Sequence, residues 1–151
     1  MLGLCLLVAC SVSAHDRSER VVVGPMEWKV NSVQTRQELS VLKYIPPEKD
    51  VFFVVSTVIT NTGTTTISLL DPILVDLQGA EYTTTRNSDV VRYLSSDFGC
   101  NFRQIESATS RHCMFVYDLA RGDKIGWTLI VTDFGSPEKT DRINLGTPKK
   151  N

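Results

Sequence analysis

Residues 51–60 have the sequence VFFVVSTVIT, and this stretch decides the fold class. Its residues are mainly β-branched or aromatic, and no glycine or proline interrupts them, which predicts a long central β-strand. Both alternating faces of this strand are apolar. The pattern therefore leaves open which set of side chains faces the core: Phe53, Val55 and Ile59, or Phe52, Val54 and Val58.

Shorter segments of the same character lie on both sides of this strand. They comprise residues 21–23, 27–33, 65–70, 73–77, 81–85, 111–118 and 127–132, separated by turn-forming residues. Asn61-Thr62-Gly63 is expected to turn the chain straight back beside the central strand. In the last segment, we expect three side chains to face inward: Trp127, Leu129 and Val131.

The remaining pattern contains no long amphipathic helix, and residues 87–97 predict about one helical turn at most. We therefore expect an all-β fold, an antiparallel β-sandwich of about seven strands. This domain is expected to span residues 26–135, after a linker at 15–25. Residues 136–151 contain two prolines and few apolar side chains, and we expect a flexible tail there.

Composition agrees with one soluble domain. The chain has 151 residues, of which 22% are charged and 42% hydrophobic, and its formal net charge is −1. Acidic and basic residues are mixed along the sequence, so no basic stripe is present to neutralise a phosphate backbone. We expect no nucleic-acid partner.

Residues 1–14 lack charged side chains and contain a short apolar run, which is typical of a secretory leader. Leu7-Val8-Ala9-Cys10 resembles the bacterial lipobox, in which Cys10 receives the lipid and becomes the mature N-terminus. The alternative is ordinary signal-peptidase cleavage after Ala14, which leaves His15 first. Either route predicts an exported protein that is periplasmic, anchored to the outer membrane or secreted. A lipid on Cys10 would be its only contact with the membrane.

Two of the four cysteines, Cys5 and Cys10, belong to the leader. The other two, Cys100 and Cys113, are expected to form a disulfide in an oxidising compartment. Such a bond closes a loop of about fourteen residues and contributes roughly 3 kcal/mol to stability. The competing interpretation is a thiolate site with His112. However, adjacent residues of a strand point to opposite faces.

Few residues are suited to catalysis. His15 and His112 are the two histidines, and a nucleophile requires a histidine held by a third group. We therefore expect no enzymatic activity and no cofactor. No metal-ligand spacing is evident; His112 and Met114 are the weak alternative, as soft ligands for copper. We interpret Arg121-Gly122-Asp123 as ordinary turn chemistry.

Three motifs together resemble a known family. A long apolar strand ends in Asn61-Thr62-Gly63, residues 76–82 are DLQGAEY, and a strand around Phe115 is followed by residues 127–131, WTLIV. This order resembles a bacterial family of exported immunoglobulin-like domains. The family carries a domain-of-unknown-function label, and it is related in fold to an immunoprotective extracellular antigen. The resemblance covers about residues 26–133. It implies an immunoglobulin-like fold and an exported, often lipid-anchored protein, and it supplies no catalytic residue.

These observations favour a non-enzymatic binding or structural module of the bacterial envelope. Its partner is expected to be an envelope protein, a cell-wall component or a host molecule, bound through loops or an open sheet edge. Two alternatives remain open. One is a small periplasmic copper-binding protein that uses His112 and Met114, and the other is an inhibitor of an envelope hydrolase.

Overall fold

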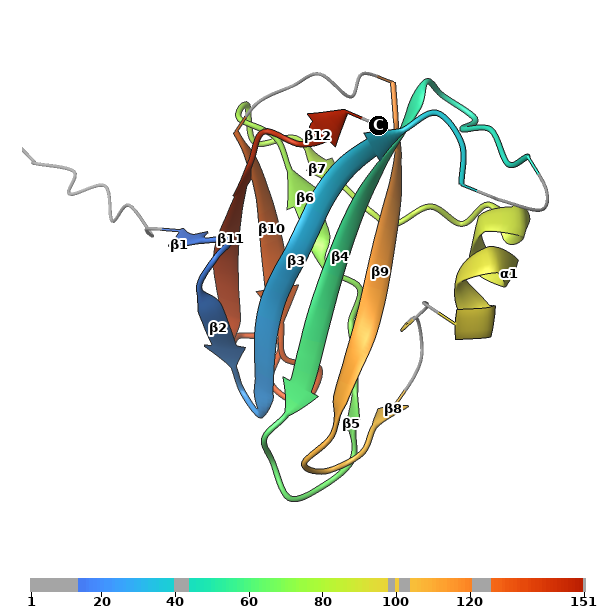
Figure 1. The fold of residues 1–151 in the computed structure, drawn as a ribbon. Coiled ribbons are helices and arrows are strands. Elements are labelled where there is room, and N and C mark those ends of the chain that lie inside the picture. Colours follow the sequence, from blue (N-terminus) through green and yellow to red (C-terminus); the bar gives the residue numbers. More distant parts are fainter. Residues whose placement is uncertain (1–13, 40–43, 98–99, 101–103, 121–125, 151) are drawn as a thin grey trace, which may run out of the picture.

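We describe the protein from a computed structural model (Figure 1). The described residues are 14–39, 44–97, 100, 104–120 and 126–150. Residues 1–13, which include most of the predicted leader and Cys10, lie outside them. The tripeptide Arg121-Gly122-Asp123 also lies outside the described residues.

Two sheets face each other. The first, called here the β10 sheet, has the order β1 (His15–Asp16), β11 (Thr140–Gly146), β10 (Trp127–Thr132), β6 (Ile73–Val75) and β7 (Glu81–Tyr82). The second, the β4 sheet, has the order β12 (Lys149–Lys150), β3 (Met26–Arg36), β4 (Val51–Asn61) and β9 (Ser110–Leu119), with β2 (Arg20–Val23) paired to β3. A separate pair joins β5 (Ile67–Ser68) to β8 (Gln104–Ile105).

The prediction of an all-β sandwich is confirmed. In the described part of the chain, seven strands are longer than two residues, namely β2, β3, β4, β6, β9, β10 and β11. The remaining strands contain two residues each. Pairing is antiparallel except at the two chain ends, where β1 pairs with β11 and β12 pairs with β3 in parallel.

The main core lies between the sheets, and its residues show which face of β4 points inward. Phe53, Val55 and Ile59 point into this core and are fully buried. The ring of Phe53 lies 5.0 Å from that of Trp127 in the opposite sheet, measured between centroids. Trp127, Leu129 and Val131 are fully buried, as predicted. Apolar contact between β4 and β10 therefore holds the two sheets together.

A second, smaller core lies on the outer face of the β4 sheet. There Phe52, Val54 and Val116 are covered by Val90 and Leu94 of α1 (Ser88–Asp97). Figure 1 shows α1 beside β9, on the outside of the sandwich. Residues 51–55 are consequently buried on both faces, which explains their unbroken apolar sequence. From Ser56 onward, where this cover ends, inward and outward residues of β4 alternate between buried and partly exposed.

Two local predictions are wrong. The chain does not turn back beside β4 after Asn61, because the neighbours of β4 are β3 and β9. The side-chain amide of Asn61 instead donates to the carbonyls of Thr65 and Ile105, and the chain continues to β5. In addition, α1 has ten residues rather than one turn. The side-chain oxygen of Asn87 accepts hydrogen bonds from the N–H groups of Asp89 and Val90, which caps the helix.

The expected flexible tail at residues 136–151 is also wrong, because it contains β11 and β12. Ile143 and Leu145 of β11 are buried in the main core, while Arg142 and Asn144 face solvent. Likewise, the expected linker at 15–25 contains β1 and β2, and Val21 is buried. The sandwich therefore extends from His15 to Lys150.

The second core provides a test of the role of α1. We expect Leu94→Ala to lower the free energy of unfolding by about 2–4 kcal/mol, because it removes a buried side chain between α1 and β4. Val91 is the matched control on the same helix, since its side chain is partly exposed. We expect Val91→Ala to change stability by less than about 0.5 kcal/mol. Urea denaturation measures both, and equal effects would contradict the packing of α1 against the sheet.

Candidate functional site

The predicted disulfide is present. Cys100 and Cys113 are bonded, with Cα atoms 5.2 Å apart, and both residues are buried in the main core. The bond ties the chain after α1 to strand β9. Cys113 points into the sandwich, whereas His112, the next residue toward the N-terminus, is exposed on the outer face. The alternative of a thiolate site with His112 is therefore wrong.

The outer face of the β4 sheet is hollowed in two places. A depression of 330 Å³ is lined by Ser56, His112, Cys113 and Met114. A second depression, of 260 Å³, is lined by Arg20, Glu27, Lys29 and Asn31, together with Val58, Thr60 and Ser110. We call the surface around these two depressions the lower outer face.

Strand register makes this surface continuous. Val58 of β4 lies opposite Lys29 on one side and opposite His112 on the other. In this row across the sheet, the apolar side chain of Val58 therefore lies between those of Lys29 and His112. In the next row Ser56 lies opposite Met114. Near the lower end, the hydroxyl groups of Thr60 and Ser110 are 2.7 Å apart and share a hydrogen bond.

Positive charge predominates on the lower outer face. Arg20 lies directly opposite Lys29 in the β2–β3 pairing, and both are exposed. Glu27 is the one carboxylate among the described residues that line the two depressions, and it accepts a hydrogen bond of 3.0 Å from Arg20. Like charges directly opposite each other on neighbouring strands repel. Glu27 therefore relieves this repulsion only in part.

The two possible copper ligands named from the sequence lie close together. His112 and Met114 are two positions apart on β9, both face outward, and both line the 330 Å³ depression. Met114 also packs against the second core. Among the described residues, no group of three or more His, Cys, Asp or Glu side chains is arranged to hold a metal ion. Any site here would depend on His112 and Met114.

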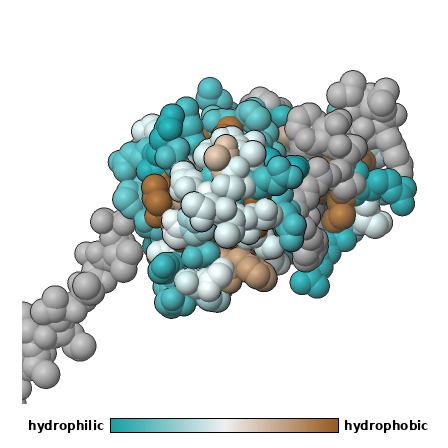
Figure 2. All heavy atoms as spheres, turned by 90° about the horizontal axis from the view of Figure 1, so that it is seen from below, coloured by the Kyte–Doolittle hydropathy of each residue, from teal (hydrophilic) through white to brown (hydrophobic). Residues whose placement is uncertain are grey.

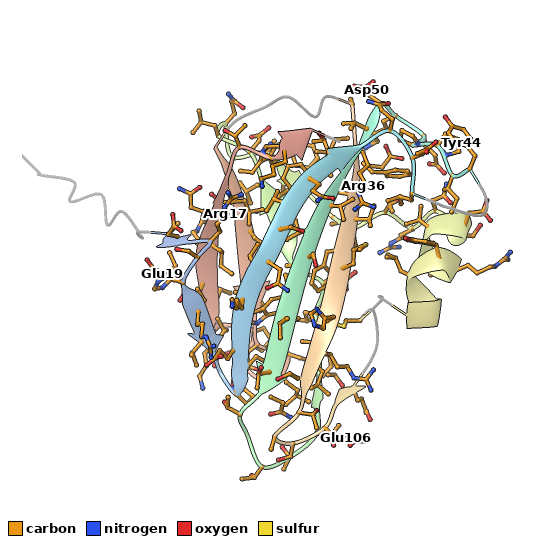
Figure 3. The ribbon with its side chains drawn as sticks, viewed as in Figure 1. Arg17, Glu19, Arg36, Tyr44, Asp50 and Glu106 are labelled. Atoms are coloured by element: carbon orange, nitrogen blue, oxygen red, sulfur yellow. A yellow bond between two sulfur atoms is a disulfide. The ribbon has the colours of Figure 1, made fainter. Side chains whose placement is uncertain are left out.

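The loops below the sheets form a hydroxyl-rich end. Thr62, Thr64, Thr65 and Thr66 are exposed, and the hydroxyl of Ser107 donates to the carbonyl of Gly63, 2.7 Å away, joining two loops. Figure 2, which views this end from below, shows mainly pale and hydrophilic surface in the coloured part, with separate apolar areas. Glu106, labelled in Figure 3, lies at the same end.

His15 lies between two carboxylates, away from the lower outer face. Its Nδ1 is 3.0 Å from Glu19 and its Nε2 is 3.1 Å from Asp141 of β11. Ionised carboxylates only accept hydrogen bonds, so both bonds form together only when the imidazole carries two protons. The hydrogen bond to Glu19 and the charge of Asp141 raise the pKa of His15 above its usual value. His15 therefore fastens the N-terminal segment to β11.

Tyr117, which is buried in the main core, also has a raised pKa. Burial raises the pKa of its hydroxyl well above the usual value, and the charge of Asp71 adds to this effect. The hydroxyl donates to the carbonyl of Pro72, 2.7 Å away. Tyr117 thus stays neutral and links β9 to the segment before β6.

In the described part of the chain, no helix is long and apolar enough to cross a membrane.

Comparison with known proteins identifies relatives in fold only. No protein-family model and no curated protein matches the chain. The yjhA protein of Bacillus subtilis superimposes with a TM-score of 0.61 at 15% identity, over 87% of this chain and 98% of that one. An uncharacterised β-sandwich protein of Clostridium difficile gives 0.56 at 15% identity, over 89% and 95% of the two chains. The secreted protein MPT63 of Mycobacterium tuberculosis gives 0.56 at 6% identity, over 91% and 99%. The chain thus has a β-sandwich fold.

The contacts of His15 predict a pH-dependent N-terminus. Because its pKa is raised above the ordinary 6.5, protonated His15 stabilises the attachment to β11 fully below that value. The contribution is lost as the pH rises through the raised pKa. We expect the backbone amide of Ser18 to be rigid in NMR relaxation at about pH 5.5 and mobile at about pH 8.5. In His15→Gln this difference should vanish. Its persistence in that variant would contradict the assignment to His15.

Proposed function

We propose that the protein is an exported, lipid-anchored and non-enzymatic module that binds a protein partner through the lower outer face. One observation carries the proposal. Part of the outer face of the β4 sheet is covered by α1, whereas another part is hollowed and lined by side chains from four strands. A hollowed surface of this kind can accommodate a partner.

Three observations support export. The leader-like sequence before His15 contains the lipobox-like Leu7-Val8-Ala9-Cys10. The disulfide between Cys100 and Cys113 is of a kind that persists in oxidising compartments. Finally, a protein of similar fold, MPT63, is described as secreted. A lipid on Cys10 would place the sandwich close to a membrane, with the N-terminal segment fastened by His15.

The arrangement of polar side chains supports binding rather than catalysis. His112 shares a depression with Ser56, but in the described part of the chain it forms no hydrogen bond with a serine or a carboxylate. Both ring nitrogens of His15 already contact carboxylates, those of Glu19 between β1 and β2 and of Asp141 on β11. Nucleophilic catalysis requires a base that is oriented by a third group.

The proposal predicts both a modified N-terminus and a localised contact. Intact-mass analysis of the native protein should give a mass that includes a diacyl or triacyl Cys10. A photo-crosslinking amino acid at Asn31, in the lower outer face, should give a covalent adduct with one protein in intact cells. Glu81, exposed on the opposite sheet, is the control position and should give none. A free N-terminal His15 would refute the anchor. Equal adducts at both positions, or none at Asn31, would refute the binding face.

A second candidate function is copper binding, which is favoured by the shared position of His112 and Met114. Imidazole and thioether groups are suitable ligands for copper, and thioether selects the reduced ion. This candidate predicts that micromolar Cu(I) raises the melting temperature. A concentration about 100 times the dissociation constant contributes about 2.7 kcal/mol. The effect should disappear in His112→Ala with Met114→Leu and remain in His15→Ala. An unchanged melting temperature in the unmodified protein would exclude copper.

A further inference from the structure

The outward side of β3 carries cationic side chains at both ends. Lys29 lies near its lower end and Arg36 near its upper end, and Figure 3 shows the labelled Arg36 on the upper part of the strand. Both face outward, since they lie opposite the outward residues Val58 and Phe52 of β4. These two partners on β4 are six residues apart (58 − 52 = 6), which in a strand corresponds to roughly 20 Å. The strand thus presents two positive groups at about that separation.

Neutral hydrogen-bonding side chains lie between these two cations. They are Asn31, Ser32 and Gln34, and Gln34 accepts two hydrogen bonds from Arg36. Asn31 is the extra residue of a β-bulge, because the register with β4 shifts between Val30 and Ser32. A bulge redirects a side chain that regular pairing would place on the other face. Here it places Asn31 in the same 260 Å³ depression as Lys29.

Lys29, like Arg36, has a charge that no ion pair offsets among the described residues. It lies opposite Arg20, and Glu27, the nearest acidic residue in the depression, is already bonded to Arg20. In the part of the chain that the structure describes, Lys29 forms no ion pair. An anion bound here would therefore offset the repulsion between Arg20 and Lys29.

We propose that the lower outer face and the adjoining outward side of β3 bind an extended, acidic segment of a partner protein. This inference rests on the proposed function and specifies the chemistry of the partner. Carboxylates of the segment pair with Lys29 and Arg36, while Asn31 hydrogen-bonds its backbone. The length argues for a peptide, because roughly 20 Å corresponds to about six extended residues. The described residues that line the two depressions include no aromatic ring on which a sugar could stack.

A short glutamate peptide tests the proposal. The probe is a fluorescent peptide of about eight glutamates, mixed with the purified, disulfide-bonded protein and followed by anisotropy. We expect binding that weakens with added salt, as it does for exposed charges. Lys29→Gln combined with Arg36→Gln should weaken binding about tenfold or more. Lys49→Gln, which removes one positive charge from an exposed loop, should leave the affinity unchanged. Thermal melts confirm that each variant is folded.

Three results would overturn the proposal: no binding of the peptide, equal weakening by Lys49→Gln, or binding only of an anionic vesicle or an acidic polysaccharide in parallel assays. These outcomes are separable from those of the proposed function. A crosslinked partner at Asn31 without peptide binding rejects the acidic chemistry and leaves the binding role in place. The absence of both rejects both.

Discussion

Strand β4 must bury both of its faces at one end and only one face at the other, and the rest of the structure depends on this constraint. Phe53 and Val55 require the opposite sheet, which β10 provides through Trp127. Phe52 and Val54 require a second cover, which α1 provides through Val90 and Leu94. Beyond Ser56 the outward side chains of β4 are polar or small enough to remain open. The candidate binding face is therefore the part of the sheet that the hydrophobic effect leaves uncovered.

The sequence predicts the strands better than it predicts their arrangement. Alternating β-branched and aromatic residues identify β3, β4, β9 and β10, and Cys100 and Cys113 are correctly paired. The length of α1 is underestimated, at one turn instead of ten residues, because its cap at Asn87 and its two buried residues, Val90 and Leu94, lie within a polar segment. Strand β11 is missed because only Ile143 and Leu145 mark its buried face. The crossover after Asn61 depends on hydrogen bonds between distant segments, which no local pattern contains.

The candidate site likewise contains residues that the sequence identifies and residues that only the strand arrangement brings together. His112 and Met114 are recognisable from sequence because they lie two positions apart on one predicted strand. Lys29, Arg20 and Val58 come from three different strands, and only the register brings them together. A signal for Asn31 exists in principle, since a break in alternation between Val30 and Val33 is consistent with a bulge. One sequence gives no means of telling such a break from ordinary irregularity.

The short parallel strands at the two chain ends also affect how copies of the protein meet. Unpaired strand edges expose N–H and C=O groups that can join with another molecule. Here β1 occupies part of the edge of β11, and β12 occupies part of the edge of β3. On β9, the carbonyl of Val116 already accepts the N–H of Thr85. At these places part of the edge backbone is already paired within the molecule, so a second copy has a shorter stretch of these edges on which to extend the sheet.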